Sequence, residues 1–401
     1  MSDEELIDYA ETVQTEKTKN TDVISSFPEL LLKDELIKAI RDANLEHPSA
    51  VQQQVIPKAV LGADILCQAK SGTGKTVVFV LSALQRISRE EGEVHDTCAR
   101  VQVVAIANTK EMVVQIANEF KRFMCYTDLN VEMVFGGVDV NGDIEKLKGR
   151  VDVVVGTPGR LFDLIVRGAL DVSQLRILII DEVDSILSSL SSRWTVQRII
   201  YKTPVGKQTM LFTATLSDEM RNTCLLMVRN PFVLQVDEER KLTLHGLEQG
   251  YVNVAEDSKR DKLIGLIDGI RDISQCVIFC RDKRRVEVLA EHLKTKGLPA
   301  VSITSDYDTN ERMQRFMSFK NLDYRFLVTT NLMARGIDIA EINLVVNYDM
   351  AEDAQTYLHR VGRAGRFETR GTAVSFICNE EDIVVLNEVQ ERFEVSIKEI
   401  K

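Results

Sequence analysis

The stretch Ala69-Lys70-Ser71-Gly72-Thr73-Gly74-Lys75-Thr76 decides the fold of this 401-residue chain. It follows a short apolar run, Asp64–Cys67, and precedes a helical pattern, which is the order of strand, loop and helix that a phosphate-binding loop requires. Glycine at two positions lets backbone N–H groups approach phosphate oxygens without a Cβ in the way. Lys75 is expected on the β- and γ-phosphates, and Thr76 is expected to offer its hydroxyl to Mg²⁺. Ala69 stands where the general pattern has glycine.

A second motif follows another apolar run, where Leu178-Ile179-Ile180 leads into Asp181-Glu182-Val183-Asp184. A strand that delivers two adjacent carboxylates at its end is expected of a nucleotide hydrolase. Asp181 is expected to hold Mg²⁺, and Glu182 to orient or deprotonate the attacking water. Taken alone, these residues could equally form a solvated acidic helix cap. Beside the phosphate loop, the catalytic interpretation is favoured.

A third motif, His359-Arg360-Val361-Gly362-Arg363-Ala364-Gly365-Arg366, concentrates arginine and glycine near the end of the chain. A basic surface face is the simple alternative. Each glycine directly precedes Arg363 or Arg366, which leaves room for both guanidiniums to approach a ligand. Arginine suits a phosphoryl group in transfer because its planar fork makes bidentate contacts. We expect both arginines to act on the phosphate loop across a cleft, so catalysis requires this cleft to close.

Between the motifs, short β-branched or aliphatic runs alternate with longer helical patterns. Strands that are buried on both faces have this composition, and their alternation with helices indicates a parallel sheet between helix layers. The pattern stops once, in a charged stretch at 236–250, and then resumes. It therefore predicts an α/β fold of two tandem domains, with strands at Val101–Ala107, Val151–Gly156, Ile177–Ile180, Cys276–Phe279, Pro299–Ile303, Arg325–Val328, Leu344–Asn347 and Ala373–Ile377.

These patterns divide the chain into four parts. We predict an acidic tail over 1–26, a first domain over 27–235 with the phosphate loop and the acidic motif, a linker over 236–250 and a second domain over 251–401. The tail holds seven acidic residues against two lysines, and it has few large apolar residues.

Composition limits the function classes. The apolar share of 44% and the charged share of 28% are ordinary for a globular protein. No apolar run reaches the roughly 18–20 residues of a membrane helix. The seven cysteines include no C-x-x-C pair, so a reducing compartment is expected, without a zinc site or a disulfide framework. The net charge of −11 argues against a general basic coat. Because arginines stand singly at motif positions, a polyanionic ligand should bind in a nucleotide-dependent manner and with a modest salt dependence.

The motifs resemble those of the DEAD-box RNA helicases of superfamily 2, in the same order from Phe27 to the end of the chain. Phe27 and Pro48-Ser49-Ala50-Val51-Gln52 resemble the Q motif, in which Gln52 reads the adenine edge and Phe27 stacks near it. Thr213-Ala214-Thr215 resembles the Ser-Ala-Thr motif that couples hydrolysis to RNA release. The resemblance implies two RecA-like domains that close on ATP and single-stranded RNA, with Mg²⁺ as cofactor.

The resemblance also assigns roles to individual residues. Catalysis is expected from Lys75, Thr76, Asp181, Glu182, Arg363 and Arg366, with Thr76 and Asp181 on the metal. ATP is expected on Phe27, Gln52, Ala69, Lys70, Ser71, Gly72, Thr73, Gly74, Lys75, Thr76 and Asp338. RNA is expected on Thr109, Lys110, Gly136, Gly137, Thr157, Pro158, Gly159, Arg160, Arg281, Arg312 and Thr330. Coupling between the two sites is expected from Thr213, Thr215, Arg335 and His359.

Some positions depart from the family motifs, and two residues have alternative interpretations. Lys110 replaces an arginine. Thr304-Ser305-Asp306 stands where the family often has a His-x-Gly turn, and Thr309 stands in place of the Gln of the following Gln-x-x-Arg, whose arginine is Arg312. Arg281 could belong to a solvated helix start instead of touching RNA. Trp194 could be an RNA-stacking platform, but a half-buried helix residue is the favoured interpretation.

The resemblance implies an RNA-dependent ATPase that holds RNA by its backbone and 2′-hydroxyls and remodels short duplexes or RNA–protein complexes. Asp237–Tyr251, Glu4–Tyr9 and Asn387–Ile397 are similar to the subgroup whose second motif usually reads Asp-Glu-Cys-Asp. That subgroup implies pre-mRNA splicing and mRNA export, splicing and export adaptor proteins as partners, a monomeric core, and the nucleus, with the cytoplasm as a second compartment. Three alternatives remain: a DNA-acting motor, a weakly hydrolysing RNA clamp or scaffold, and a helicase of translation or ribosome assembly.

Overall fold

The computed structural model describes residues 26–69, 72–88, 101–235, 247–270, 272–334, 339, 341–364 and 371–400. Several predictions from the sequence lie outside these ranges. They are the acidic tail up to residue 25, most of the linker, and the roles of Lys70, Ser71, Arg335, Asp338 and Arg366. The side chain of Thr309 lies outside the description as well.

The first domain is built on a seven-stranded parallel sheet with the strand order β3-β4-β2-β5-β6-β1-β7. The central strands are almost continuously aliphatic because helices cover both faces of the sheet. The strands are β1 (Ile65–Gln68), β2 (Val103–Ile106), β3 (Val131–Val134), β4 (Val153–Gly156), β5 (Ile177–Ile180), β6 (Gln208–Thr213) and β7 (Phe232–Gln235).

Helices pack on both faces of this sheet, and a short 3₁₀ helix, η1 (Phe27–Leu30), precedes them. Alternate residues of a strand serve opposite layers, since Ile179 packs on one side of the sheet and Leu178 and Ile180 on the other. The helices are α1 (Asp34–Asp42), α2 (Ala50–Val60), α3 (Lys75–Arg86), α4 (Lys110–Phe123), α5 (Val140–Leu147), α6 (Pro158–Val166), α7 (Val183–Ser188), α8 (Leu190–Lys202) and α9 (Asp218–Leu225).

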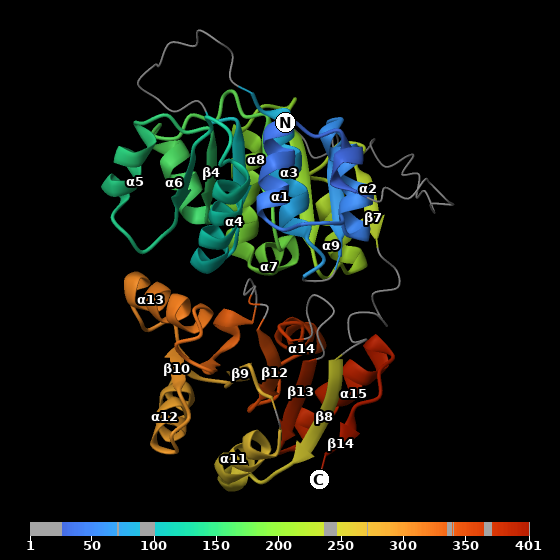
Figure 1. The fold of residues 1–401 in the computed structure, drawn as a ribbon, viewed down its shortest axis with the longest axis vertical. Coiled ribbons are helices and arrows are strands. Elements are labelled where there is room, and N and C mark those ends of the chain that lie inside the picture. The colour runs from blue at the N-terminus through green and yellow to red at the C-terminus, as the bar shows by residue number, and fades with distance from the viewer. Residues whose placement is uncertain are drawn as a thin grey trace, which may run out of the picture.

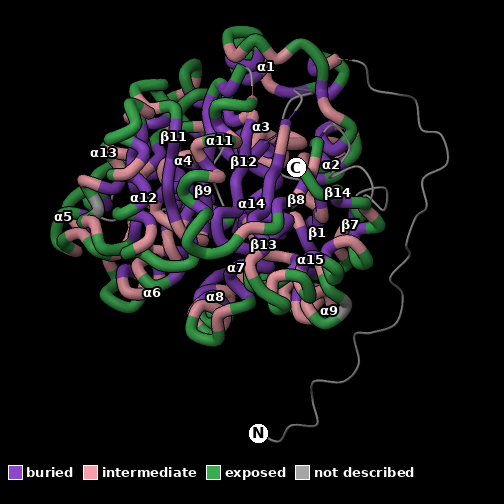
Figure 2. Tube along the Cα trace, turned by 90° about the horizontal axis from the view of Figure 1, so that it is seen from below, coloured by how far each residue is buried: buried purple, intermediate pink, exposed green. Residues whose placement is uncertain are grey.

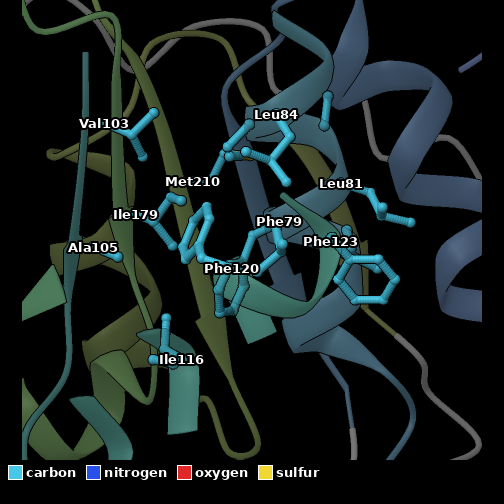
Figure 3. Packing of buried hydrophobic residues seen from close by; sticks show 14 of the residues in the cluster. Phe79, Leu81, Leu84, Val103, Ala105, Ile116, Phe120, Phe123, Ile179 and Met210 are labelled. Carbon is cyan, nitrogen blue, oxygen red and sulfur yellow. The ribbon is translucent and has the colours of Figure 1, made fainter. Parts of the chain in front are cut away.

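Aromatic side chains fill the space between the sheet and the helices α3 and α4 (Figure 3). Phe79 and Phe120 point toward Ile179 and Met210 of the sheet, and all four are fully buried. The ring of Phe79 also packs on that of Phe212 in a tilted arrangement, with the centroids 5.2 Å apart. This packing fixes α3, whose first residue is Lys75 of the phosphate loop, against the sheet.

The second domain repeats the architecture with a seven-stranded parallel sheet in the order β10-β11-β9-β12-β13-β8-β14. Its strands are β8 (Leu247–Asn253), β9 (Gln275–Phe279), β10 (Ala300–Ile303), β11 (Phe326–Thr329), β12 (Ile342–Asn347), β13 (Gly371–Ile377) and β14 (Lys398–Glu399). The helices are η2 (Glu256–Ser258), α11 (Lys259–Gly269), α12 (Lys283–Thr295), α13 (Thr309–Lys320), η3 (Asn331–Met333), α14 (Ala354–Val361) and α15 (Glu380–Phe393). The predicted class, two tandem α/β domains with parallel sheets, is confirmed.

One predicted boundary needs correction. Strand β8 begins at Leu247, inside the range predicted as linker, and it pairs with β13 over its whole length. The two glycines and the charges of 236–250 suggested a linker, but tertiary pairing with β13 recruits its last four residues into the sheet.

The two domains lie one above the other, and α14 of the second faces α7 of the first (Figure 1). Viewed along the long axis, the buried strands occupy the centre and exposed helices surround them (Figure 2). Among the described helices, none combines the length and the apolar character needed to cross a membrane.

Candidate nucleotide and RNA site

The phosphate loop joins β1 to α3, as the sequence predicts. Gly72 and Gly74 both have a φ of 83°, in the left-handed region that glycine tolerates best. A Cβ on Gly74 would collide with Nε2 of Gln52, so a side chain there would displace Gln52 as well as adopt a left-handed φ. The ammonium of Lys75 donates to the carbonyls of Ala69 and Thr213, the latter at 3.2 Å. Lys75 therefore lies where the ends of β1 and β6 meet.

The predicted Q motif packs directly on this loop. Ser49 and Gln52 form a capping box at the start of α2, in which each side chain binds the other residue's backbone N–H. The Ser49 hydroxyl also donates to the Thr73 carbonyl at 2.7 Å, and Nε2 of Gln52 donates to the Gly74 carbonyl at 3.4 Å. The Q motif thus supports the loop mechanically. Phe27 packs into the hydrophobic core and is 2% exposed, so its stacking on a base stays a prediction.

The acidic motif lies at the end of β5, next to the loop. Burial raises the pKa of Asp181, and the nearby Lys75 ammonium and the Glu182 backbone N–H, 2.9 Å from Oδ1, oppose this shift. Glu182 has a φ of 48°, a left-handed conformation that is uncommon for a residue other than glycine. It occupies the cap position of α7 but makes no cap hydrogen bond with its side chain. Glu182 therefore stands at the start of α7 without capping it through its side chain, and its left-handed backbone conformation is of the kind that gathers at functional sites.

Arg363 from the second domain acts on Glu182. Burial raises the pKa of the Glu182 carboxyl, and the positive charge of Arg363 is the strongest influence that opposes this rise. Arg363 is buried, and its Nε donates to the His359 carbonyl at 3.0 Å, which fixes the side chain against the end of α14. An arginine and the predicted catalytic carboxylate thus come together from different domains.

Arg360 has a different role from its neighbour. It is fully buried, donates to the Asn331 side chain and to the Asp349 carbonyl at 2.8 Å each, and lies over the Phe279 ring. Burial lowers the pKa of its guanidinium to about 10. This arginine of the motif therefore braces the second domain instead of touching the nucleotide.

A hydrogen-bonded cluster connects the two domains behind the catalytic carboxylates. The Thr215 hydroxyl donates to Asp184 at 2.6 Å, and Nε2 of His359 lies 3.3 Å from the same oxygen. Nε2 of Gln355 lies 2.7 Å from the Thr215 hydroxyl and 3.4 Å from Asp184. The Thr213 hydroxyl braces the cluster by donating to the Thr215 carbonyl.

This cluster brings together three of the predicted coupling residues, Thr213, Thr215 and His359. Gln355 was missed by the sequence reasoning. The sequence feature that could have identified Gln355 is its position four residues before His359, which places both side chains on the same face of α14.

The predicted RNA-binding residues of the first domain lie at the starts of helices. The Thr157 hydroxyl accepts from the Gly136 N–H at 3.4 Å, immediately before Pro158 begins α6. Gly137 has a φ of 86° in the adjoining turn. Thr109 stands at the start of α4 and caps this helix with its side chain by accepting from the Met112 N–H. Backbone N–H groups at helix starts favour anions such as phosphate.

Lys110, Arg160 and Arg312 gather at this surface from both domains. The pKa of Lys110 is lowered by burial and then by the like charges of Arg312 and Arg160, while Glu111 opposes the shift. Arg160 is held by an ion pair with the buried Asp143. Three predicted RNA contacts therefore form one positive cluster.

Arg312 has a partner that the sequence did not predict. Its Nε lies 2.5 Å from a carboxylate oxygen of Glu111, a residue of α4 in the other domain, and both side chains are buried. The atoms are close without hydrogen-bond geometry. Arg312 thus belongs to the domain interface as well as to the predicted RNA surface.

Other predicted residues have simpler surroundings. Gly159 in α6 has open space where a Cβ would stand. The Thr330 hydroxyl caps η3 by accepting from the Leu332 N–H at 3.4 Å. Arg281 is exposed, and its backbone N–H donates to Asp349. The local contacts of Arg281 give no preference between RNA and solvent.

The residues present fit a Mg²⁺ ion. A carboxylate, Asp181, and a hydroxyl, Thr76, are oxygen donors of the type that Mg²⁺ prefers, and nucleotide phosphates and water complete such sites. In the part of the chain that the structure describes, no three His, Cys, Asp or Glu side chains gather as a metal cluster. The donor set therefore suits an ion that arrives with a nucleotide.

Two RecA-like domains, with a phosphate loop in one and an arginine of the other beside its predicted catalytic carboxylate, define the class of a nucleotide hydrolase. Two family models match the chain, the DEAD/DEAH box helicase over residues 49–223 and the helicase conserved C-terminal domain over 258–368. The chain belongs to the DEAD-box family of ATP-dependent RNA helicases and is an ATP-hydrolysing enzyme.

Relatives match over nearly the whole length. The chain is 44% identical to ATP-dependent RNA helicase WM6 of Drosophila melanogaster, covering 99% of this chain and 96% of that protein. It is 45% identical to DEAD-box ATP-dependent RNA helicase 15 of Arabidopsis thaliana, covering 99% and 95%. Among solved structures, S. cerevisiae Dbp5 bound to RNA and ADP BeF3 superposes with a TM-score of 0.84 at 28% identity, over 94% of this chain and 95% of that one.

Proposed function

We propose that this helicase is an RNA-dependent ATPase that clamps single-stranded RNA when ATP closes its two domains, and that it acts in pre-mRNA splicing and mRNA export. The observation that carries the proposal is the meeting of Arg363 with Glu182 across the domains, beside the cluster of Thr215, Asp184 and Gln355. Hydrolysis and domain closure then depend on the same contacts.

In this proposal, the loop glycines and Lys75 bind the β- and γ-phosphates. Glu182 orients the attacking water at the β–γ bond, and Arg363 stabilises the charge that develops on the transferred phosphoryl group. An arginine supplied across a cleft contributes about 10³–10⁵ in rate. Mg²⁺ on Asp181 and Thr76 would supply charge neutralisation at the phosphate oxygens. Since Arg363 arrives only with the second domain, an open enzyme should hydrolyse slowly.

RNA would bind across both domains, on the positive cluster of Lys110, Arg160 and Arg312 and on the helix starts at Thr109 and Thr157. These groups suit the sugar–phosphate backbone, so little sequence preference is expected. Closure would bend the bound strand and thereby separate short duplexes or displace proteins.

The cellular role rests on similarity. Two observations support a role in splicing and export: the similarity of Glu4–Tyr9, Asp237–Tyr251 and Asn387–Ile397 to the subgroup, and the WM6 relative. This role implies the nucleus, with the cytoplasm as a second compartment. Solved structures of the neighbour S. cerevisiae Dbp5 include this protein bound to Gle1 and to Nup159. We propose splicing and export adaptors as partners of this chain, with the core acting as a monomer.

The test of the mechanism is ATP turnover with single-stranded RNA, with single-stranded DNA and without nucleic acid. We expect strong stimulation by RNA alone. Lys75→Ala should abolish turnover, whereas Lys121→Ala, an exposed lysine on α4, should leave it unchanged. Glu182→Gln should retain ATP and RNA without turnover. Equal stimulation by DNA would contradict an RNA-specific enzyme, and turnover that survives Lys75→Ala would contradict the mechanism.

The test of the cellular role is co-purification of splicing and export proteins with the Glu182→Gln variant, which should hold its RNA and partners. Recovery of ribosomal or translation factors instead would assign the enzyme to the alternative pathway.

A further inference from the structure

Helix α8 carries an exposed aromatic face that the catalytic mechanism does not use. Trp194 is 66% exposed and Tyr201 is 88% exposed, with Leu190 at the start of the same helix exposed as well. The prediction of a half-buried Trp194 is therefore wrong. The buried side of α8 is provided by Val196 and Ile199, which face the sheet and turn Trp194 outward.

The same face is positively charged. Helix α8 contains Arg193, Arg198 and Lys202 and no acidic residue, in a protein whose net charge is −11. Within the described ranges, these three cations form no ion pair, and Arg198 lies over the Phe162 ring with its guanidinium carbon 5.2 Å from the centroid. A cationic surface with exposed aromatic rings is complementary to a strand that offers phosphates and bases.

The face also includes a hollow. An open depression of about 290 Å³ is lined by Phe162, Trp194, Gln197, Arg198, Tyr201 and Lys202. Trp194 and Tyr201 are seven residues apart on one helix, which places them about 10 Å apart along its axis. Two bases of one strand could each stack on one ring.

The hollow adjoins the predicted RNA surface. Helices α6 and α8 pack against each other, side by side at the edge of the first domain (Figure 2). Phe162 lies one helical turn after Pro158 and Gly159, two predicted RNA contacts at the start of α6. The hollow therefore begins about one helical turn from the predicted RNA contacts at the start of α6.

We infer that the aromatic and basic face of α8 is an accessory binding site for single-stranded RNA that extends beyond the clamp. This inference rests on the proposed function, because it requires RNA on the start of α6. An acidic protein segment is the other ligand class that fits a cationic face. Continuity with the RNA surface and the wide spacing of the two rings favour RNA.

The experiment uses the full chain, a nonhydrolysable ATP analogue, and two oligouridylates, a short one that fills the clamp and a long one with single-stranded extensions. Because Trp194 is the chain's one tryptophan, its fluorescence reports on this face alone. We expect the long RNA to quench this emission and the short RNA to leave it unchanged. Tyr201→Ala and Arg198→Gln should weaken long-RNA binding about ten-fold and leave short-RNA binding unaltered. Leu226→Ala, an exposed apolar residue after α9, is the matched control.

The outcomes separate the two proposals. If the short RNA stimulates ATPase but Trp194 does not respond to the long RNA, the accessory site is wrong and the proposed function stands. If a glutamate-rich peptide changes the emission and RNA does not, the face binds protein and the RNA inference is overturned. If neither RNA stimulates ATPase, the proposed function fails and the accessory site fails with it.

Discussion

The side-chain amide of Gln355 lies 2.7 Å from the hydroxyl of Thr215, and this contact joins α14 of the second domain to the end of β6 in the first. The same hydroxyl donates to Asp184, one residue beyond the α7 start. A displacement of either domain therefore breaks the contacts of Gln355 with Thr215 and with Asp184 of the acidic motif. In the proposed mechanism, this contact links domain closure to the predicted catalytic carboxylates.

Replacing Gln355 should uncouple RNA binding from hydrolysis. Loss of a buried hydrogen bond costs about 1–3 kcal/mol, so Gln355→Leu should lower RNA-stimulated ATPase about ten-fold and leave RNA-free turnover unaltered. Gln355→Glu should lower RNA-stimulated ATPase further, since it places a second carboxylate beside Asp184. Steady-state ATPase rates measured over an RNA titration give the RNA-stimulated and the RNA-free turnover of both variants. Thr356→Ala is the control, because that hydroxyl binds Asp353 within its own helix; an equal loss in this variant would point to damage of α14 in general.

The pair of Glu111 and Arg312 should favour the closed conformation. Removing one partner of a buried ion pair is costly because it leaves the other charge uncompensated. We expect Glu111→Gln and Arg312→Gln each to raise the RNA concentration needed for half-maximal ATPase, and the double variant to lose less than the sum of both. If Arg312 served only to bind phosphate, Glu111→Gln would leave RNA affinity unchanged or strengthen it.

Substitution of Gly74 should abolish nucleotide binding. An alanine there would adopt a left-handed φ and place its Cβ against the Gln52 side chain. Gly74→Ala should therefore show no ATP-dependent rise in melting temperature. Gly142→Ala in α5, where a Cβ meets open space, should bind ATP normally and be more stable by about 0.5–1 kcal/mol. ATP binding that is retained by the Gly74 variant would mean that the loop tolerates a side chain.

The cysteines should differ sharply in reactivity. Burial raises the pKa of Cys224 to about 12, so its thiol should resist alkylation at mildly alkaline pH, while the exposed Cys125 should react readily. Peptide mapping after iodoacetamide treatment of the native and the unfolded protein checks this. Because the folded pKa is raised, the contribution of Cys224 to stability is present below the pKa of an unfolded thiol and is lost as pH rises toward about 12. Equal labelling of both cysteines in the native state would contradict the buried environment.

Much of the nucleotide site could be predicted from the sequence because its chemistry is local. The phosphate loop is a contiguous run between a strand and a helix, and Asp181 and Glu182 stand at the end of one strand. The aliphatic runs that form β2, β4 and β5 predict buried parallel strands for the same reason, since burial on both faces leaves no polar alternation.

The sequence by itself determined the two-domain α/β fold and the position of the phosphate loop between a strand and a helix, because periodicity and short-range spacing are properties of neighbouring residues. Tertiary structure alone decided that Arg312 pairs with Glu111, that Gln355 reaches Thr215, that Arg360 is a core residue and that Trp194 faces solvent. These outcomes depend on which elements meet across the fold and between the domains. The contacting residues are far apart along the chain, so no local sequence pattern predicts these contacts.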